Sequence, residues 1–359
     1  MDIPINNSYL VAGPIAAVIA IALFPIWIPI LRKFGVMDHP NARKVHSVPI
    51  PRMGGVVIFV AFAIPVWLLS PPAADEWHGV LLGSAVALAI GCADDLWSVS
   101  APIKLLSLFA LTLLIWHFGI VTHLPLCPKG SLYCMGMNTV LNLLVTMLWL
   151  TGVCSAMNAL DHMDGLAAGV SIIAAAAYLL VSIQTNQTEW ALMSLALVGA
   201  LTGFLLFNKP PARVFMGDSG SFFLGFALAT IGIMGGWSSN PLKAAVVPIS
   251  VLSMPIFDLC HVLLFRHLSG TTKTLREAIV YCGKDHIGHR LRTMGFSRSA
   301  TLVMVCFIAT TAAISALVIR QANYLESTLL LIQIAMIYIT LTVLMEMARR
   351  RQNNEKKCD

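Results

Sequence analysis

The sequence predicts an all-α integral membrane protein, a polytopic bundle of about eleven (ten or eleven) transmembrane helices. Hydrophobic residues make up 58% of the chain, the mean hydropathy is +0.81, and only 11% of the residues are charged. No soluble domain of this size is so apolar. The apolar residues also fall into separate runs, most of them close to the ~20 residues that an α-helix needs to cross a bilayer.

The first apolar run, 8–31, contains Pro14, Pro25 and Pro29, and we expect it to be kinked. It lacks a basic leading region and a small-residue cleavage site, which favours a retained helix over a signal peptide. Several of the later runs are short for a span, so their ends are expected to shift by a few residues. In order, these runs are 53–70, 79–93, 102–120, 139–157, 165–184, 190–207, 219–236, 243–265, 299–319 and 325–346.

The basic residues predict the orientation. If the loop 32–52 lies inside and the spans alternate, all but three of the 23 lysines and arginines fall on the inner side. The exceptions are Lys129, Lys243 and Arg320. This asymmetry follows the positive-inside rule. We therefore expect a multi-pass protein of the bacterial inner (cytoplasmic) membrane, with its N-terminus outside and its C-terminus in the cytoplasm.

A single domain is expected. We expect residues 1–348 to form one transmembrane domain with cytoplasmic loops 32–52 and 266–298, and residues 349–359 to form a polar cytoplasmic tail. The net charge of +6 requires no nucleic acid partner, because a basic face over anionic membrane lipids accounts for it. Cys127 and Cys134 share a predicted outside loop, where they form either a disulfide or two free thiols.

The few carboxylates lie at the ends of apolar runs. Asp94 and Asp95 occur in GCADDLWS, Asp161 and Asp164 in NALDHMDG, and Asp218 in FMGDSG. An acid costs about 2.5–3.5 kcal/mol at the centre of a membrane helix and less towards the interface. The alternating topology brings all five to the side of the basic loops. This predicts a shared task, and a bound divalent cation is the obvious way to hold so much negative charge together.

Each acidic motif also has a simpler interpretation. Asp94 and Asp95 are either a base with its orienting partner or an interfacial pair that caps the next helix. Lys104, just inside that helix, favours function because its ammonium could reach a phosphate. Asp218 alone resembles a helix cap, but beside four other acids it becomes a candidate Mg²⁺ ligand.

Asn158, Asp161 and Asp164 recur at every third residue, so their side chains would lie along one side of a helical turn. Their oxygens suit a hard cation or the hydroxyl groups of a sugar or base. A polar cap for the helix that begins at 165 explains one of the acids but hardly all three residues.

A cationic group lies in the loop 266–298. In GKDHIGHRL, His286, His289 and Arg290 favour contact with a phosphate or sugar; a solvated basic face and a zinc site remain alternatives. Asp258, inside an apolar run, is a weaker site candidate. Acidic and basic groups on one membrane face suit a phosphorylated substrate with a divalent cation, and the membrane location argues that one substrate is a lipid.

Five segments carry a resemblance. The chain resembles the polyprenyl-phosphate N-acetylhexosamine-1-phosphate transferases, an MraY/WecA-like family, and is closer to the WecA branch. The resemblance extends from about Asp38 to Arg292. The matching segments, in the family's order, are DHPNARKVHSVPIPRMGG, ADD with Lys104, NALDHMDGLAAG, VFMGDSGS and DHIGHRL.

The resemblance implies a reaction. It is the transfer of N-acetylhexosamine 1-phosphate, with GlcNAc-1-phosphate the best guess, from a UDP-sugar to undecaprenyl phosphate. UMP is released, and Mg²⁺ (or Mn²⁺ as a substitute) is the cofactor. It also implies a homodimer and the first membrane step of cell-envelope polysaccharide (O-antigen or related) synthesis. The implied roles are catalysis for Asp94 and Asp95, metal binding for Asn158 and Asp218, nucleoside contact for Asp161 and Asp164, phosphate contact for Lys104, sugar and pyrophosphate contact for His286, His289 and Arg290, and a less definite substrate contact for Arg43, Lys44 and His46.

Two positions depart from the family pattern. Gly288 replaces the second histidine of the usual His-Ile-His-His, and His162 stands where a glycine is common. Both bear on the exact sugar more than on the reaction. The main alternative is a phospho-MurNAc-pentapeptide transferase of peptidoglycan synthesis, whose typical His-rich run is missing here. An ion-coupled transporter and a non-catalytic scaffold are alternatives from other classes.

Overall fold

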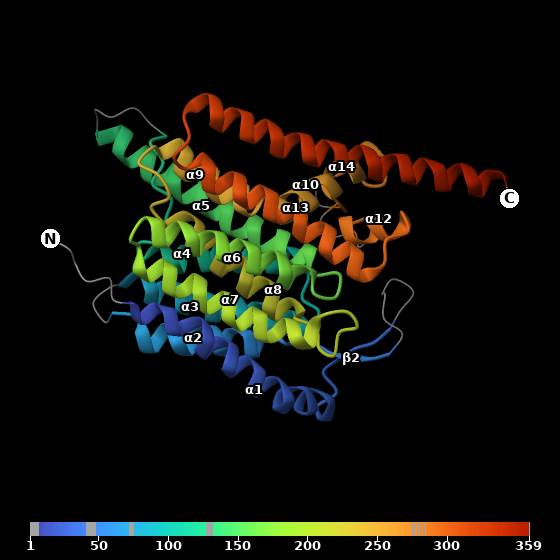
Figure 1. The fold of residues 1–359 in the computed structure, drawn as a ribbon, viewed down its shortest axis with the longest axis horizontal. Coiled ribbons are helices and arrows are strands. Elements are labelled where there is room, and N and C mark those ends of the chain that lie inside the picture. Colours follow the sequence, from blue (N-terminus) through green and yellow to red (C-terminus); the bar gives the residue numbers. More distant parts are fainter. Residues whose placement is uncertain are drawn as a thin grey trace.

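The structure, a computed structural model, is a bundle of helices that run mostly along one direction (Figure 1). It describes residues 7–40, 48–71, 75–126, 132–274, 277–278, 281, 283 and 285–358. The helices are η1 (Asn7–Val11), α1 (Ala12–Lys33), α2 (Gly55–Leu69), α3 (Asp75–Trp97), α4 (Ala101–Trp116), α5 (Leu132–Leu160), α6 (Leu166–Gln184), α7 (Thr188–Asn208), α8 (Gly217–Met234), α9 (Pro241–Val251), α10 (Ser253–Leu268), α12 (Ile287–Thr293), α13 (Arg298–Ile319) and α14 (Tyr324–Cys358).

The predicted multi-pass membrane protein is confirmed. Among the described residues, 8 helices are long and apolar enough to cross a membrane, and the bent pair α9 and α10 raises the number to 9. Helices α2 and α4 are apolar but shorter, with 15 and 16 residues. The expected total of about eleven spans therefore stays a prediction.

One predicted helix is wrong. The run 243–265 was expected to be continuous, but the chain bends by 74° between α9 and α10. Pro255 has no N–H to donate to the carbonyl of Val251, and its ring crowds that carbonyl. Helix α14 continues through the polar tail as far as Cys358.

Helix α8 is the centre of the bundle and packs against α3 and α5. Its residues from Ser219 to Gly232 are all buried. Gly91 of α3 and Gly55 of α2 let the start of α8 approach closely: a Cβ on Gly91 would collide with the backbone of Asp218, and one on Gly55 with the backbone of Gly220. These contacts hold the ends of three helices together.

One end of the bundle carries the irregular structure. Strands β1 (Met37–Asp38) and β2 (Ile50–Pro51) pair antiparallel there, with Met37 opposite Pro51, and α12 lies at the same end, on the right of Figure 1. The start of α14 lies at the opposite end. Arg43, Lys44, His46 and Cys127 lie outside the described residues, as does the side chain of Cys134, so the predicted disulfide remains untested.

Candidate functional site

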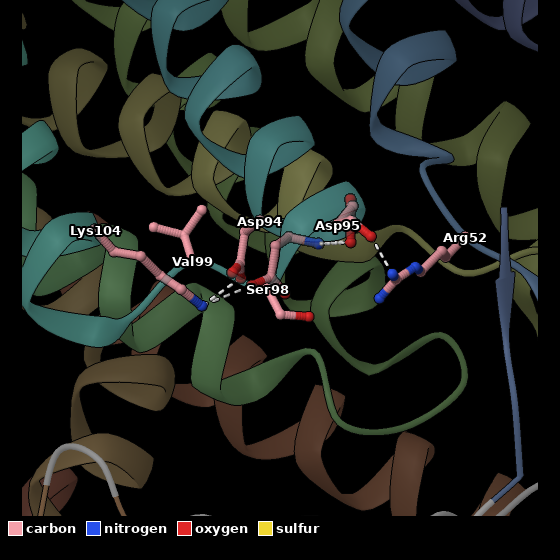
Figure 2. A pocket seen from close by; sticks show the side chains of 7 residues that line it. Arg52, Asp94, Asp95, Ser98, Val99 and Lys104 are labelled. Carbon is pink, nitrogen blue, oxygen red and sulfur yellow. Dashed lines mark hydrogen bonds and ion pairs between the residues drawn. The ribbon is translucent and has the colours of Figure 1, made fainter.

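A polar cavity of about 250 Å³ opens where the end of α3 meets the starts of α4 and α8 (Figure 2). Four separate segments contribute to it, and charged side chains dominate its lining. The lining residues are Arg52, Asp94, Asp95, Ser98, Val99, Lys104 and Asp218. Three acids and one base that were predicted from two motifs, ADD with Lys104 and VFMGDSGS, therefore share one cavity.

Asp94 faces this cavity from the last turn of α3 and is 8% exposed. The Nζ atom of Lys104 contacts its Oδ2 atom and lies 3.2 Å from Oδ2 of Asp218. In Figure 2 the Lys104 and Asp94 side chains point toward one another. One ammonium group thus bridges two carboxylates that would otherwise repel each other.

Asp95 points to different partners. Its Oδ1 atom accepts a hydrogen bond from the backbone N–H of Asp218 at 3.1 Å, and Oδ2 accepts one from Ser219 at 3.0 Å. Both donors belong to the first turn of α8, where a carboxylate satisfies unpaired N–H groups and the helix dipole. The capping alternative therefore describes Asp95, although the helix that it caps is α8.

Arg52 was counted in the sequence only as part of a basic loop, yet it lines the cavity. It donates a hydrogen bond from Nη2 to the backbone carbonyl of Asp95 (Figure 2). The signal was available, because Arg52 ends the PIPR segment of the first matching motif. Its neighbour Met53 has φ 75°, a backbone conformation that non-glycine residues rarely adopt.

Asn158 lies in the last turn of α5, beside the start of α8. Its Nδ2 atom donates to Oγ of Ser221 at 3.0 Å, and that hydroxyl donates to the backbone carbonyl of Asp218 at 3.3 Å. The two residues that the resemblance assigns to a metal therefore lie side by side, which could not be foreseen from their separation in the chain.

Asp161 and Asp164 differ in their surroundings. Burial raises the pKa of Asp161 well above its usual range, and the negative charges of Asp218, Asp95 and Asp164 add to the effect. Asp164 instead accepts a hydrogen bond from the Ala212 N–H at 3.3 Å and lies 3.4 Å from an Arg298 nitrogen. Asp161 thus belongs electrostatically to the cavity acids, whereas Asp164 ties neighbouring segments together.

The donor set of this cavity fits a magnesium ion. The carboxylates of Asp94, Asp95 and Asp218 outnumber the cationic groups of Arg52 and Lys104, so the cavity keeps negative charge that a cation can attract. Carboxylate and amide oxygens are also the hard ligands that Mg²⁺ prefers.

A second polar cluster lies around α12. The Nδ1 atom of His286 is 2.8 Å from Oδ2 of Asp258, whose Oδ1 accepts the backbone N–H of Ile287 at 2.7 Å. Asp258 is fully buried. A buried carboxylate with two such partners sets the orientation of the imidazole. Asp258, the weaker candidate in the sequence, therefore positions His286.

His162 joins this cluster from the loop that follows α5. Its ring centroid lies 5.1 Å from those of both His286 and His289. Burial lowers the pKa of His162 to about 4, so the ring is neutral at pH 7. The sequence marked His162 only as a departure from the family pattern, and its contact with the other histidines was missed.

These side chains raise the zinc alternative again. Ligand atoms of His162, Asp258 and His286 lie within 4.8 Å of one another. The two Asp258 oxygens, however, already accept hydrogen bonds from His286 and Ile287. These two hydrogen bonds favour a role for the Asp258 carboxylate in orienting His286 over a role as a metal ligand.

Arg290, which was expected to contact the sugar and pyrophosphate, makes contacts with other residues of the protein. Its Nε atom donates to the Asp285 carbonyl at 2.6 Å, and its guanidinium lies 4.1 Å from the Phe265 ring centroid. The Asp285 side chain in turn pairs with two nitrogens of Arg266 at 2.6 and 2.8 Å. These contacts shape the loop that carries the histidines, and Arg290 is 8% exposed.

Fold and cavity together define a polytopic membrane protein with a charged polar site at one end of its bundle. The profile of the family described as "Glycosyl transferase family 4" matches residues 77–236. The chain is 30% identical over 317 residues to a Bacillus subtilis protein named "Probable undecaprenyl-phosphate N-acetylglucosaminyl 1-phosphate transferase", covering 87% of this chain and 85% of the relative. The chain belongs to this family.

Two further relatives show the range of the family. A Mycobacterium tuberculosis "Decaprenyl-phosphate N-acetylglucosaminephosphotransferase" is 28% identical over 330 residues, covering 84% of this chain and 80% of the relative. A "Phospho-N-acetylmuramoyl-pentapeptide-transferase" of Symbiobacterium thermophilum is 32% identical over 246 residues, covering 62% of this chain and 72% of the relative. The predicted family is confirmed, and the muramoyl-pentapeptide enzyme covers less of this chain.

Proposed function

We propose that the chain transfers N-acetylglucosamine 1-phosphate from UDP-GlcNAc to undecaprenyl phosphate and releases UMP. The observation that carries the proposal is the Lys104 ammonium held between Asp94 and Asp218 in a polar cavity at one end of a membrane bundle. The names of the Bacillus and Mycobacterium relatives support the same reaction. We place it as the first membrane step of cell-envelope polysaccharide synthesis.

In the proposed step, an oxygen of the lipid phosphate attacks the β-phosphorus of UDP-GlcNAc. The bond from that phosphorus to the bridging oxygen breaks, and the bridging oxygen leaves with UMP. Asp94 orients the lipid phosphate or takes its proton, because it faces the cavity while Asp95 is engaged with α8. Lys104 binds the phosphate oxygens, since positioning and charge neutralisation dominate phosphoryl transfer.

Magnesium is part of the proposal. Asp218 and Asn158 would hold it, as neighbours that offer a carboxylate and an amide oxygen. When bound, the cation neutralises charge on the pyrophosphate. Asp161 lies within the electrostatic influence of Asp218, and we propose that it contacts the nucleoside from there.

The proposed setting is the bacterial inner membrane, with the cavity facing the cytoplasm, where nucleotide sugars are made. The N-terminus then lies outside and the C-terminus inside, as the basic residues predict. A homodimer is the expected assembly. A MurNAc-pentapeptide donor is the second candidate, supported by the similarity to the Symbiobacterium enzyme.

The test is UMP release by purified protein in lipid vesicles. Release should require UDP-GlcNAc, undecaprenyl phosphate and Mg²⁺ together, and the muramoyl-pentapeptide nucleotide should not replace UDP-GlcNAc. Asp94→Asn and Asp218→Asn should abolish it. Glu326→Gln in α14 is the matched control, an isosteric amide substitution at the opposite end of the bundle. Full activity in both aspartate variants would overturn the site.

A further inference from the structure

Gly288 lies within α12, where its backbone does not require a glycine. Its φ is not positive, unlike that of Gly165. Glycine inside a helix costs about 0.5–1 kcal/mol relative to alanine, so this glycine needs another reason. A Cβ at position 288 would lie 2.4 Å from the Sδ atom of Met163 and 2.5 Å from the Nε2 atom of His162, so one or both side chains would have to move. The glycine makes room for the Met163 side chain and the His162 ring.

The His162 ring has one nitrogen engaged and one available. Its Nδ1 atom lies 2.9 Å from the Ala159 carbonyl oxygen. A carbonyl oxygen can only accept, so Nδ1 carries the proton and Nε2 of the neutral ring has a lone pair. That Nε2 atom is buried and makes no hydrogen bond with any residue in the described part of the chain.

A buried acceptor without a partner costs free energy, which indicates a ligand that supplies a donor. The surroundings of the atom point to the same conclusion, because the ring lies 5.1 Å from both His286 and His289. These are the residues expected to contact the sugar and pyrophosphate. His162 therefore lies among them with a buried lone pair that has no partner in the described part of the chain.

We propose that His162 is a specificity-determining residue whose Nε2 atom accepts a hydrogen bond from a hydroxyl or the acetamido N–H of the donor sugar. It replaces, from another loop, the histidine that Gly288 removes from the His-Ile-His-His pattern. The inference rests on the proposed function for its UDP-sugar donor.

The donor's other groups fit this atom poorly. A phosphate oxygen at neutral pH accepts hydrogen bonds, and so does the Nε2 lone pair, so the two repel. A zinc ion would need Asp258, whose two oxygens are already hydrogen-bonded by His286 and Ile287. The donors that remain in the substrate are the hydroxyl and acetamido groups of the sugar and, on the nucleoside, the ribose hydroxyls and the uracil N–H. The position of His162, with its ring 5.1 Å from those of His286 and His289, favours the sugar.

The test compares binding of UDP-GlcNAc with binding of UDP, which has no sugar, to full-length protein by calorimetry in Mg²⁺. His162→Leu keeps bulk but removes the acceptor, and it should weaken UDP-GlcNAc about 10-fold to 100-fold while UDP changes less than about twofold. His162→Gln restores an acceptor and should recover part of the loss. His117→Leu, an exposed histidine at the end of α4, is the matched control.

A second comparison tests the exchange itself. Gly288→His alone should displace His162 and weaken UDP-GlcNAc, whereas the double variant His162→Gly with Gly288→His should bind it better than either single variant. Unchanged UDP-GlcNAc affinity in His162→Leu, equal losses for UDP and UDP-GlcNAc, or a stoichiometric zinc ion lost with His162 would each overturn the inference.

Binding also separates this inference from the proposed function. Wild-type protein that binds UDP-GlcNAc more tightly than UDP but releases no UMP would refute the transfer reaction. The affinities of the His162 variants for UDP-GlcNAc and UDP would then still test whether His162 contacts the sugar. A lowered melting temperature identifies any variant with a folding defect. If His162→Leu has such a defect, the affinities of His162→Gln and of the double exchange variant test the inference instead. Wild-type protein with no preference for the sugar nucleotide would overturn the inference directly.

Discussion

The structure separates two adjacent aspartates, and this separation predicts different consequences for the same substitution. Asp95→Asn keeps one carbonyl oxygen for the two N–H groups of Asp218 and Ser219 and loses the charge at the start of α8. One hydrogen bond to a charged group contributes about 1.5–3 kcal/mol. The helix-dipole interaction adds about 0.3–1 kcal/mol. The expected destabilisation is therefore about 2–4 kcal/mol.

Asp94→Asn should behave differently. Lys104 remains paired with Asp218 at 3.2 Å, and the new amide oxygen can still accept from the ammonium. Because Lys104 keeps one carboxylate partner and the amide keeps a hydrogen bond, the change in the free energy of unfolding should stay within about 1.5 kcal/mol, the net contribution of one hydrogen bond. Activity, by contrast, should fall by about 100-fold or more, since the group nearest the reacting phosphate is lost.

The assay measures UMP release and the midpoint of thermal unfolding on the same detergent-solubilised preparations. Asp94→Asn should melt near the wild type and be inactive, while Asp95→Asn should melt several degrees lower. Lower substrate turnover in Asp95→Asn then follows from a displaced α8. Equal melting temperatures for Asp95→Asn and wild type would refute the capping role, and an equally destabilised Asp94→Asn would refute the separation.

Further predictions concern the neighbouring groups. Lys104→Met should lower UMP release at least 100-fold and steepen the Mg²⁺ requirement, because Asp94 and Asp218 lose their shared cation; an unchanged Mg²⁺ titration would count against this. Asp258→Asn should raise the KM for UDP-GlcNAc by about 10-fold or more through a misoriented His286, whereas the KM for undecaprenyl phosphate should hold. Asp161 has a pKa raised by burial and by neighbouring acids, so its contribution to stability falls as pH rises from its usual 3.8 towards the folded value. Asp161→Asn should therefore melt higher than wild type at pH 8 without Mg²⁺, a gain that should vanish at pH 4; a lower melting temperature at pH 8 would contradict the repulsion.

Much of the fold followed from the sequence because a bilayer demands long apolar helices with internally satisfied backbones. The spans could be predicted from the lengths of the apolar runs. The placement of the acids at one end followed from letting successive spans alternate in direction. The break at Leu252 was missed, although Pro248 and Pro255 flank it in the sequence. Hydropathy takes no account of missing backbone N–H groups, so the apolar run 243–265 was predicted as one continuous helix.

The division of labour within the site was not predictable from local pattern. Asp95 caps α8, a helix that begins more than a hundred residues later, and no spacing rule connects the two. The contact between His162 and Gly288 is equally remote. A signal for it did exist, because one position gained a histidine where the family has glycine and the other made the reverse exchange. Both had been noted, but without a structure nothing joined them.

The central claim is that the cavity moves a sugar together with its phosphate, and β-³²P-labelled UDP-GlcNAc tests it most directly. Wild-type protein with undecaprenyl phosphate and Mg²⁺ should transfer the label to the lipid fraction and release unlabelled UMP, and Asp94→Asn should leave the label in the nucleotide. Label that stays in released UDP would contradict the reaction. Label that becomes covalently attached to the protein would contradict direct attack by the lipid phosphate.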